Sequence, residues 1–306
     1  MTESATRSAE SSEPARPPLP VALLKACRPK QWAKNVLVFV APAAAGVLTQ
    51  AYELRLTLQG FVAFCMVSSA TYLLNDVLDV ESDRRHPKKR LRPIASGAVP
   101  IPVAIVAAAV LFVAGVALAA FTNWTLAGVV AGYAVLTTLY SLFLKQVAVL
   151  DLVILSAGFI LRLLGGAYAA GVEVSEWFLL VSLFGSLFIA GAKRFAEKQE
   201  LGEEAAALRP TLGAYSVEYL GFVRSVAAAA VMISYCQWAV ESGKTGHLAT
   251  PWVQLSIIPF VIAILRYALL VDHGEGSAPE EVLSSDRQMQ LMGGLLVLCL
   301  FLAVYV

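Results

Sequence analysis

The sequence predicts an all-α membrane protein with about nine transmembrane helices, and three observations support this fold class. Hydrophobic residues make up 58% of the 306 residues, charged residues make up only 15%, and the mean hydropathy is +0.71. A soluble domain usually carries about 25% charged residues, so the composition indicates a membrane protein. Apolar runs of about twenty residues, long enough to cross a bilayer, recur along the chain. Lysine and arginine gather in alternate connections between these runs, which is typical of membrane proteins.

Nine apolar runs have the length of a membrane-spanning helix. They lie near residues 34–50, 57–76, 101–121, 124–143, 149–171, 177–193, 219–240, 251–271 and 288–306. The first run is interrupted by Pro42. The first twenty residues are rich in Ser, Pro and Glu and contain no apolar run. We therefore expect residues 1–24 to form a disordered cytoplasmic tail and residues 25–306 to form one transmembrane domain.

The distribution of basic residues predicts the orientation in the membrane. With the N-terminus in the cytoplasm, only Arg55 and Lys244 fall in outside connections, and three arginines fall within spans. The other 18 of the 23 Lys and Arg residues then lie on the cytoplasmic side. The charged connections 77–100 and 193–218 share that side, so we expect polar chemistry at the cytoplasmic mouth of the bundle.

An acidic and basic cluster, NDVLDVESDRRHPKKRLRP at residues 75–93, follows the second apolar run. If the helix of that run continues through the cluster, Asp76, Asp79 and Asp83 lie within about 60° of one another, and Glu81 points nearly opposite. Three carboxylates on one face near a membrane require a compensating cation. Mg²⁺ binds through a few carboxylates together with substrate phosphates. We therefore predict these three aspartates as Mg²⁺ ligands.

Basic residues at the same mouth suit a substrate that carries phosphate groups. Lys30 and Lys34 are four residues apart and would share a face of an α-helix. The alternative is that the bases only follow the positive-inside rule and pair with the acids in a solvated loop. The basic set consists of Lys30, Lys34, Lys89, Arg90, Arg92, Lys145, Lys193 and Arg194.

The fifth apolar run carries two charged residues, Asp151 and Arg162. They are about 20° apart around a helix and about 16 Å apart along it. Asp151, near the mouth, suits substrate hydroxyl groups or a metal. Arg162 lies deep in the span and must face protein or a wet cavity, so a structural ion pair and a substrate contact both stay open. Lys193 and Glu197 either pair with each other, four residues apart, or leave Lys193 for a phosphate.

The pattern Asn75-Asp76-x-x-Asp79-x-x-x-Asp83, followed by Arg90-x-Arg92-Pro93-Ile94-Ala95-x-Gly97, resembles the first Asp-rich motif of the UbiA superfamily of intramembrane prenyltransferases. The resemblance implies a UbiA-like helical bundle that covers nearly the whole chain after residue 25. It also implies a catalytic site in which Asp76, Asp79 and Asp83 hold Mg²⁺ and Asn75 contacts the substrate or orients an aspartate.

Three further segments resemble the phosphoribosyl-transferring branch of that superfamily: Arg28-Pro29-Lys30-Gln31-Trp32-Ala33-Lys34-Asn35, Tyr140-Ser141-x-x-Leu144-Lys145 leading to Leu150-Asp151, and Gly191-Ala192-Lys193-Arg194-x-Ala196-Glu197. The resemblance implies transfer of 5-phosphoribose from phosphoribosyl diphosphate to a polyprenyl phosphate such as decaprenyl phosphate, for synthesis of a cell-wall arabinan precursor. It implies a bacterial plasma membrane protein with its site on the cytoplasmic side. Many superfamily members carry a second motif spaced DxxxD, whereas this chain offers Asp151 alone. The implied substrate-binding set is Lys30, Lys34, Lys89, Arg90, Arg92, Tyr140, Lys145, Asp151, Arg162, Lys193 and Arg194.

Two other functions stay open at this point. An aromatic prenyltransferase of quinone or haem biosynthesis would share the metal motif. A transporter could use Asp151 and Arg162 as an ion relay. The KKRLR sequence does not indicate nucleic-acid binding, because it lies beside three aspartates at a membrane surface.

An isoprenoid substrate needs an apolar route that is open to lipid. The small residues 165–167 and the Ala-rich stretch 104–120 permit close helix approach or a lateral opening. The sequence leaves the oligomeric state open, a homo-oligomer included.

Overall fold

The computed structural model describes residues 17–201, 210–246, 248–274, 282 and 285–306. Every regular element among these residues is helical. The first elements are α1 (Leu19–Ala26), η1 (Pro29–Phe39), α2 (Val40–Ala44), η2 (Val47–Thr49), α3 (Ala51–Leu78), α4 (Val80–Arg85), η3 (Lys89–Leu91), α5 (Ile101–Thr122), α6 (Trp124–Leu142) and η4 (Leu144–Gln146). Then follow α7 (Leu150–Ala170), α8 (Glu176–Leu201), α10 (Pro210–Ala214), α11 (Val217–Lys244), α12 (Trp252–Leu255), α13 (Ile257–Asp272) and α15 (Arg287–Tyr305).

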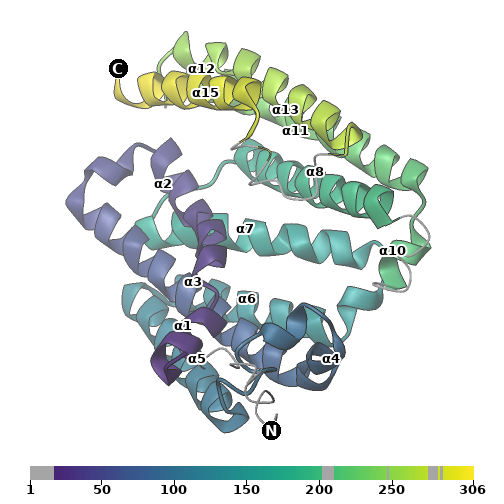
Figure 1. Ribbon diagram of the computed structural model, residues 1–306. Coiled ribbons are helices and arrows are strands. Elements are labelled where there is room, and N and C mark those ends of the chain that lie inside the picture. Colours follow the sequence, from purple (N-terminus) through teal and green to yellow (C-terminus); the bar gives the residue numbers. More distant parts are fainter. Residues whose placement is uncertain (1–16, 202–209, 247, 275–281, 283–284) are drawn as a thin grey trace, which may run out of the picture.

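The helices form two groups that flank α7 (Figure 1). α1, α4, α5 and α6 lie on one side of α7; α8, α11, α12, α13 and α15 lie on the other, and α2 lies on the α8 side. In the spanning windows of α3 and α7, 56% and 50% of the residues are buried, compared with 11% in α15. α3 and α7 therefore form the centre of the bundle, and α15 presents most of its surface to lipid.

Eight helices in the described part of the chain are long and apolar enough to cross a membrane. They coincide with eight of the nine predicted runs, which confirms those eight. The run at 34–50 folds differently, as the 3₁₀ helix η1 followed by the short helices α2 and η2. Pro42 carries no N–H for the carbonyl of Val38 four residues earlier, and Gly46, with a φ of +71°, separates α2 from η2.

The freed carbonyl of Val38 lies against Gly166 at the centre of the bundle. A β-carbon added to Gly166 would stand 1.7 Å from that oxygen, and one added to Gly165 would stand 2.3 Å from the ring of Phe64. The small residues at 165–167 therefore permit close approach of η1 and α3 to α7. This stretch is a tightly packed contact and not a lateral opening.

Replacing Gly166 with alanine is expected to destabilise the protein by at least the upper end of the roughly 1–3 kcal/mol typical of overpacked cores. The added methyl group meets backbone, which cannot rotate away as a side chain can. The matched control is Gly128→Ala in α6, where an added β-carbon meets nothing within 4 Å, and which gains helix propensity of about 1 kcal/mol. Thermal unfolding in the same detergent would compare the two variants. Equal melting temperatures would contradict the close contact.

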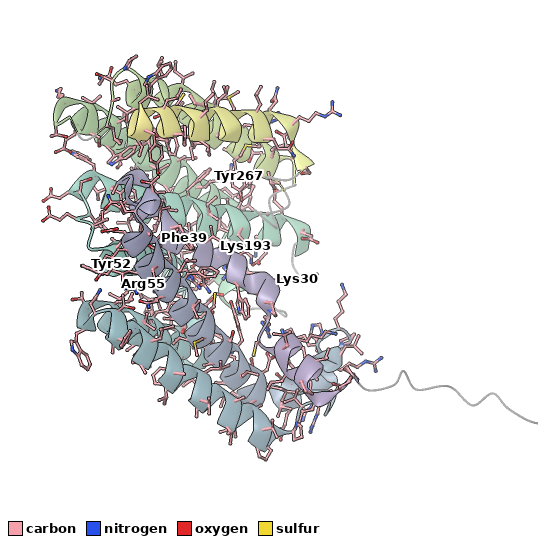
Figure 2. All side chains as sticks on the ribbon, turned by 90° about the vertical axis from the view of Figure 1, so that its left-hand side faces the viewer. Lys30, Phe39, Tyr52, Arg55, Lys193 and Tyr267 are labelled. Atoms are coloured by element: carbon pink, nitrogen blue, oxygen red, sulfur yellow. The ribbon has the colours of Figure 1, made fainter. Side chains whose placement is uncertain are left out.

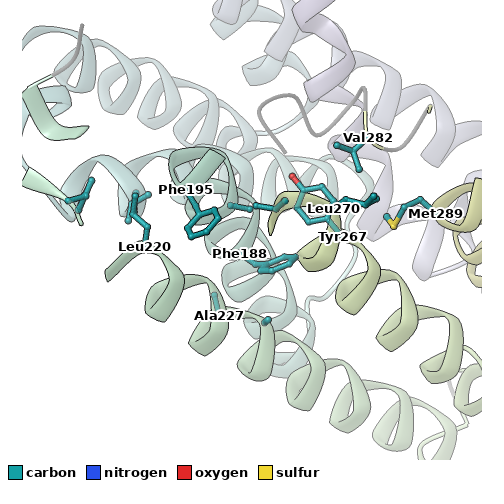
Figure 3. Packing of buried hydrophobic residues seen from close by; sticks show 14 residues of the cluster. Phe188, Phe195, Leu220, Ala227, Tyr267, Leu270, Val282 and Met289 are labelled. Carbon is teal, nitrogen blue, oxygen red and sulfur yellow. The ribbon is translucent and has the colours of Figure 1, made fainter. Parts of the chain in front are cut away.

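One apolar core joins α8, α11, α13 and α15 (Figure 3). Phe188 and Phe195 of α8, Leu220 of α11, and Tyr267 and Leu270 of α13 are all at most 5% exposed. The rings of Phe188 and Tyr267 meet edge to face, with centroids 5.6 Å apart. Leu152 of α7 belongs to the same core, which therefore joins α8 to α7 as well as to α11 and α13.

The structure corrects two predicted boundaries. α1 begins at Leu19, so residues 19–24 are helical and not disordered, because Ala22 and Ala26 are buried in a cluster with Ala70 and Leu73 of α3. Residues 1–16 of the predicted tail lie outside the described part of the chain. α8 continues to Leu201, well beyond the predicted end at 193, since Arg194 pairs with Asp151 of α7 and Lys198 donates to the Leu212 carbonyl of α10.

The two ends of the bundle differ in chemistry (Figure 2). Lys30 and Arg55 lie at opposite edges of the molecule. Arg55 stands over the ring of Tyr52, 5.3 Å from its centroid, whereas the end that carries Lys30 also carries the acidic cluster. The assignment of that charged end to the cytoplasm remains a prediction from the basic residues.

Candidate functional site

The acidic motif lies where α3 ends and α4 begins. α3 ends at Leu78, and Asp79 adopts a turn conformation (φ −91°, ψ 6°) before α4. The Asp83 N–H still donates to the Asp79 carbonyl at 2.8 Å, so the chain keeps a nearly helical course. Asp76 and Asp83 are each 2% exposed, whereas the side chain of Asp79 is 45% exposed. The motif thus has two buried carboxylates and one accessible carboxylate.

Two guanidinium groups neutralise the buried aspartates. Nη1 of Arg92 lies 2.6 Å from Oδ2 of Asp83 and 3.2 Å from Oδ1 of Asp76. Nη2 of Arg28 lies 2.5 Å from the same Oδ1 of Asp76. A buried carboxylate requires such partners, because moving an unpaired charge out of water is costly. The predicted substrate ligand Arg92 is thereby held between two predicted metal ligands.

Arg28 is a site residue that the sequence prediction did not include. It has a left-handed backbone (φ 55°, ψ 61°) at the start of η1, and its guanidinium lies 5.0 Å from the centroid of the Tyr72 ring. The adjacent Pro29 is the local sequence signal for the turn. The contact with Asp76 joins residues 48 apart in the chain, so local pattern could not reveal it.

Asp79 departs from the predicted arrangement. Its Oδ1 lies 3.9 Å from Nζ of Lys145 in η4, and its side chain is accessible, unlike those of Asp76 and Asp83. In the residues that the structure describes, no three acidic, His or Cys side chains converge on a metal position. Glu81 is exposed, as predicted.

The side chains of the motif nevertheless have the chemistry that Mg²⁺ requires. All their candidate ligand atoms are oxygens, the donor type that Mg²⁺ prefers. Oδ1 of Asn75 is buried and has no hydrogen-bond partner among the described residues, so it can accept from a substrate donor or bind a cation. Arg92 occupies the position between Asp76 and Asp83 where a cation would contact both carboxylates. Asn75, Asp76, Asp79 and Asp83 are the residues that would hold Mg²⁺.

A second charged cluster surrounds Asp151 in the first turn of α7. Asp151 is completely buried; its Oδ2 lies 3.0 Å from Nε of Arg194, and its Oδ1 accepts from the Tyr215 hydroxyl at 2.5 Å. Nη1 of Arg194 donates to Glu197 at 2.7 Å, and Nη2 donates to the Tyr140 hydroxyl at 3.4 Å. Two carboxylates therefore share one guanidinium, and the cluster joins α6, α7, α8 and the start of α11.

Tyr215 is the second site residue that sequence reasoning missed. Its hydroxyl also accepts from the N–H of Val149 at 2.5 Å. Val149 has a φ of 70°, which β-branched residues rarely adopt. Burial and the hydrogen bond to Asp151 raise the pKa of the Tyr215 phenol above its ordinary value, so this group stays a neutral donor at physiological pH. Tyr215 connects α10 to the carboxylate of Asp151.

Replacing Tyr215 with phenylalanine is expected to destabilise the protein by about 1–3 kcal/mol, because it leaves a buried carboxylate oxygen and the Val149 N–H unpaired. The matched control is Tyr219→Phe. Tyr219 stacks on Tyr215 with ring centroids 5.6 Å apart, but its hydroxyl makes no hydrogen bond with a described residue. Chemical or thermal denaturation of both variants would measure the difference. A Tyr215→Phe variant as stable as Tyr219→Phe would show that the hydroxyl does not support Asp151.

The structure separates Arg162 from Asp151. Arg162 is 6% exposed and donates through Nε to Asn35 (2.8 Å), through Nη1 to the Gly158 carbonyl (2.7 Å) and through Nη2 to the Tyr133 hydroxyl (2.7 Å). Its hydrogen-bond acceptors in the described chain are neutral, so the alternative of a structural ion pair is wrong. The two charges belong to different networks, which removes the geometric basis for an ion relay.

The remaining predicted bases occupy different positions. Lys193 makes no ion pair with a described residue, and Glu197 pairs with Arg194 instead. Lys30 is exposed and Lys34 is half-buried. They do not share a face, because η1 is a 3₁₀ helix with three residues per turn and not an α-helix. Lys89 and Arg90 are exposed in and beside η3, where they extend the basic surface.

Two apolar cavities adjoin the central helices. The larger, of about 950 Å³, lies among η1, α2, α8, α11 and α15, and includes Phe159 and Leu163 of α7. The smaller, of about 450 Å³, lies among α3, α5 and α6. Ala108 and Ala109 of the Ala-rich stretch line the smaller one, so a lateral opening is present at that stretch and not at the glycines of α7.

Comparisons with characterised proteins agree with this geometry. The chain is 43% identical over 312 residues to the decaprenyl-phosphate phosphoribosyltransferase of Corynebacterium glutamicum, covering 100% of this chain and 94% of that protein. It is 42% identical over 301 residues to the protein of that name from Mycolicibacterium smegmatis, covering 94% and 95% of the two chains. It is 43% identical over 274 residues to that of Mycobacterium tuberculosis, covering 88% and 90%.

Solved structures share the fold. A UbiA homologue from Archaeoglobus fulgidus bound to GPP and Mg²⁺ has a TM-score of 0.68 at 17% identity, covering 93% of this chain and 100% of that one. The apo structure of a UbiA homologue from Aeropyrum pernix has a TM-score of 0.58 at 16% identity, covering 86% and 94%. Residues 36–304 match the UbiA prenyltransferase family. With its acidic motif at the junction of α3 and α4 and this helical bundle, the chain belongs to the UbiA prenyltransferase family.

Proposed function

We propose that this protein transfers the 5-phosphoribosyl group of phosphoribosyl diphosphate to decaprenyl phosphate and releases diphosphate. The observation that carries the proposal is the full-length similarity, at 42–43% identity, to relatives named decaprenyl-phosphate phosphoribosyltransferase. The geometry adds support, since one carboxylate–guanidinium cluster lies at the end of α3 and another surrounds Asp151 at the start of α7. The product would serve as a precursor of cell-wall arabinan.

In this reaction the bond between ribose C1 and the diphosphate oxygen breaks, and an oxygen of the lipid phosphate bonds to C1. The lipid phosphate is already anionic at neutral pH, so no general base is required. Catalysis then depends on positioning and on electrostatic stabilisation of the leaving group. This agrees with a site rich in Asp, Arg and Lys.

The proposed roles follow from burial and accessibility. Asn75, Asp76, Asp79 and Asp83 would hold Mg²⁺, whose chemistry when bound is to neutralise charge on the departing diphosphate. Arg28 and Arg92 hold the buried carboxylates in place and keep further N–H groups for phosphate oxygens. The more accessible bases attract and bind the phosphate groups of both substrates: Lys30, Lys34, Lys89, Arg90, Lys145 and Lys193.

Asp151 and Arg194 have a different proposed role. Each is held on several sides by neighbouring groups, so neither has the freedom of a surface ligand. A carboxylate fixed in this way can accept from ribose hydroxyl groups with little loss of conformational entropy. Tyr140 lines this region from α6, whereas Arg162 is proposed to contact substrate from its separate network deeper in α7.

The protein is proposed to lie in the bacterial plasma membrane with the acidic motif on the cytoplasmic side. Eight apolar helices support a multi-pass protein, and the excess of basic residues at the end that carries the motif supports the orientation. Arg55→Cys and Arg90→Cys variants, each labelled at the new cysteine from either side of sealed vesicles, would test this orientation. We expect labelling of position 90 only from the cytoplasmic side.

The proposed activity can be tested with purified protein in nanodiscs. Radiolabelled phosphoribosyl diphosphate and decaprenyl phosphate are supplied with Mg²⁺ or with EDTA, and label in the lipid fraction is measured. We expect transfer with Mg²⁺, loss of transfer with EDTA, and recovery when Mg²⁺ is restored, because the carboxylates alone repel the diphosphate. Transfer that continues unchanged in EDTA would contradict the metal role. Activity only on a prenyl diphosphate and an aromatic acid would replace the proposed substrates.

A further inference from the structure

Arg28 reaches Asp76 from a backbone conformation that few residues adopt. It connects α1 to η1: its N–H donates to the Lys25 carbonyl at 3.1 Å, and its carbonyl accepts from the Gln31 N–H at 2.8 Å. With a φ of 55° and a ψ of 61°, the residue lies in the left-handed region, which residues with a β-carbon rarely occupy. Such a conformation persists only where neighbouring contacts hold it. The contacts on either side of Arg28 therefore decide whether its guanidinium stays at the motif.

Ser69 of α3 supplies contacts on both sides of Arg28. Its hydroxyl oxygen lies 3.2 Å from the carbonyl oxygen of Cys27, within donating distance. The same oxygen accepts from the indole N–H of Trp32, four residues after Arg28, at 3.0 Å. It also lies 2.7 Å from the Cys65 carbonyl oxygen of its own helix. One side chain of α3 thus holds the end of α1 and the first part of η1 in place.

These contacts lie in a tightly packed part of the bundle. Ser69 is 1% exposed and Cys27 is 8% exposed. Trp32 packs against the apolar cluster that contains Cys27, Ala70 and Leu73. A buried hydroxyl that meets a donor and an acceptor fixes both, because leaving either of them unpaired away from water is costly. Packing and hydrogen bonds therefore set the position of Arg28 against its own backbone preference.

The guanidinium that this arrangement positions keeps donors for a ligand. Nη2 of Arg28 contacts Oδ1 of Asp76, and the guanidinium carbon lies 5.0 Å from the centroid of the Tyr72 ring. In the described part of the chain, no hydrogen-bond acceptor contacts its Nε or Nη1. The side chain is 31% exposed, so these N–H groups can donate to an oxyanion, and a planar guanidinium binds phosphate oxygens through two N–H groups.

We propose that Ser69 is a positioning residue of the site: it acts through Arg28, which it holds where the guanidinium contacts Asp76 and can bind the diphosphate of the donor substrate. This inference rests on the proposed function, since it assigns the group that Arg28 binds. Ser69 precedes Asp76 by seven residues, about 10 Å along α3. The same helix therefore carries the carboxylate and the side chain that fixes its partner, so the two groups keep their relative position.

Ser68 offers a matched comparison on the same helix. It is 2% exposed, and its hydroxyl also contacts η1, through Nδ2 of Asn35 at 3.3 Å. Its other hydrogen-bond partner in the described chain is the Cys65 carbonyl. Ser68 thus supports η1 without touching the residues that flank Arg28. Ser68→Ala and Ser69→Ala remove the same group, and only Ser69→Ala should affect the guanidinium.

The test measures the Kd of inorganic diphosphate, with saturating Mg²⁺, for the purified protein in nanodiscs by isothermal titration calorimetry. We expect Arg28→Gln to raise this Kd about tenfold or more, as for the loss of a hydrogen bond from a charged group. Ser69→Ala should raise it at least about threefold, because a displaced guanidinium keeps only part of that bond. Ser68→Ala should bind diphosphate as the wild type does. Trp32→Phe removes the donor from the η1 side and leaves α3 unchanged, so it should weaken binding as well.

A double variant separates positioning from general support of the fold. If Ser69 acts through Arg28, Ser69→Ala should not change the Kd further once Arg28→Gln is present. Additive effects of the two substitutions would overturn the proposal, as would wild-type affinity in both Ser69→Ala and Trp32→Phe, or an equal loss of affinity in Ser68→Ala. Diphosphate binding requires no turnover. A wild-type protein that binds diphosphate but transfers no phosphoribose would overturn the proposed function, while the Kd values would still decide the role of Ser69.

Discussion

Replacing Asp76 or Asp83 with asparagine is expected to lower kcat/KM for phosphoribosyl transfer by about 10²–10⁴-fold, the range found when a catalytic electrostatic group is removed. Both side chains are buried and share Arg92. The amide keeps the shape of the side chain but loses the negative charge that a metal ion requires. Asp79→Asn is expected to have a comparable effect, since Asp79 is the accessible carboxylate through which a cation would join the buried pair.

The matched control for these variants is Glu81→Gln. Glu81 lies in α4 between Asp79 and Asp83, but it is exposed, so the variant should keep most of its activity. Initial rates at varied phosphoribosyl diphosphate and Mg²⁺ would separate a loss of metal affinity from a loss of turnover. Size-exclusion chromatography and thermal unfolding would verify that each variant is folded. A Glu81→Gln protein as inactive as Asp83→Asn would contradict the assignment of the motif.

Replacing Arg162 with leucine is expected to lower the free energy of unfolding by about 2–6 kcal/mol. The substitution leaves the Asn35 carbonyl oxygen and the Tyr133 hydroxyl without their donor, and each unpaired buried polar group costs about 1–3 kcal/mol. The guanidinium also lies 4.6 Å from the centroid of the Tyr133 ring, a contact that leucine cannot replace. The network joins η1, α6 and α7, so its loss should loosen the centre of the bundle.

Arg55→Leu is the control for that variant, because it removes the same group from an exposed position, and surface substitutions usually change stability by about 0.5 kcal/mol or less. Arg162→Lys tests geometry, since an ammonium group cannot supply the planar set of donors. We expect it to be intermediate in stability. Thermal unfolding in one detergent would compare all three variants. An Arg162→Leu protein as stable as the Arg55→Leu protein would show that the network is not a structural support.

Eight of the spans were predictable because the requirement for them is local. A helix that crosses a bilayer must be apolar over about twenty residues, and that property is visible in the sequence alone. The ninth run met the same requirement but folds as η1, α2 and η2. Pro42 indicated an interruption, but the close contact of Val38 with Gly166 depends on how η1 lies against α7, and hydropathy does not describe that.

In the candidate site, too, some features follow from the local sequence and others depend on tertiary packing. The seven-residue spacing of Asp76 and Asp83 and the outward position of Glu81 follow from helical periodicity, and the structure agrees with both. The turn of Asp79 toward Lys145 does not follow, because it requires a break in the helix and a partner from a different segment.

The sequence by itself determined the membrane class, the position of most spans and the acidic motif, because each depends on residues close together in the chain. Only the tertiary structure decided which charges meet. Arg28 reaches Asp76 across 48 residues, and Tyr215 reaches Asp151 across 64. In an apolar bundle a buried charge requires a partner. That partner can come from a segment far away in the sequence, so the local sequence does not reveal it.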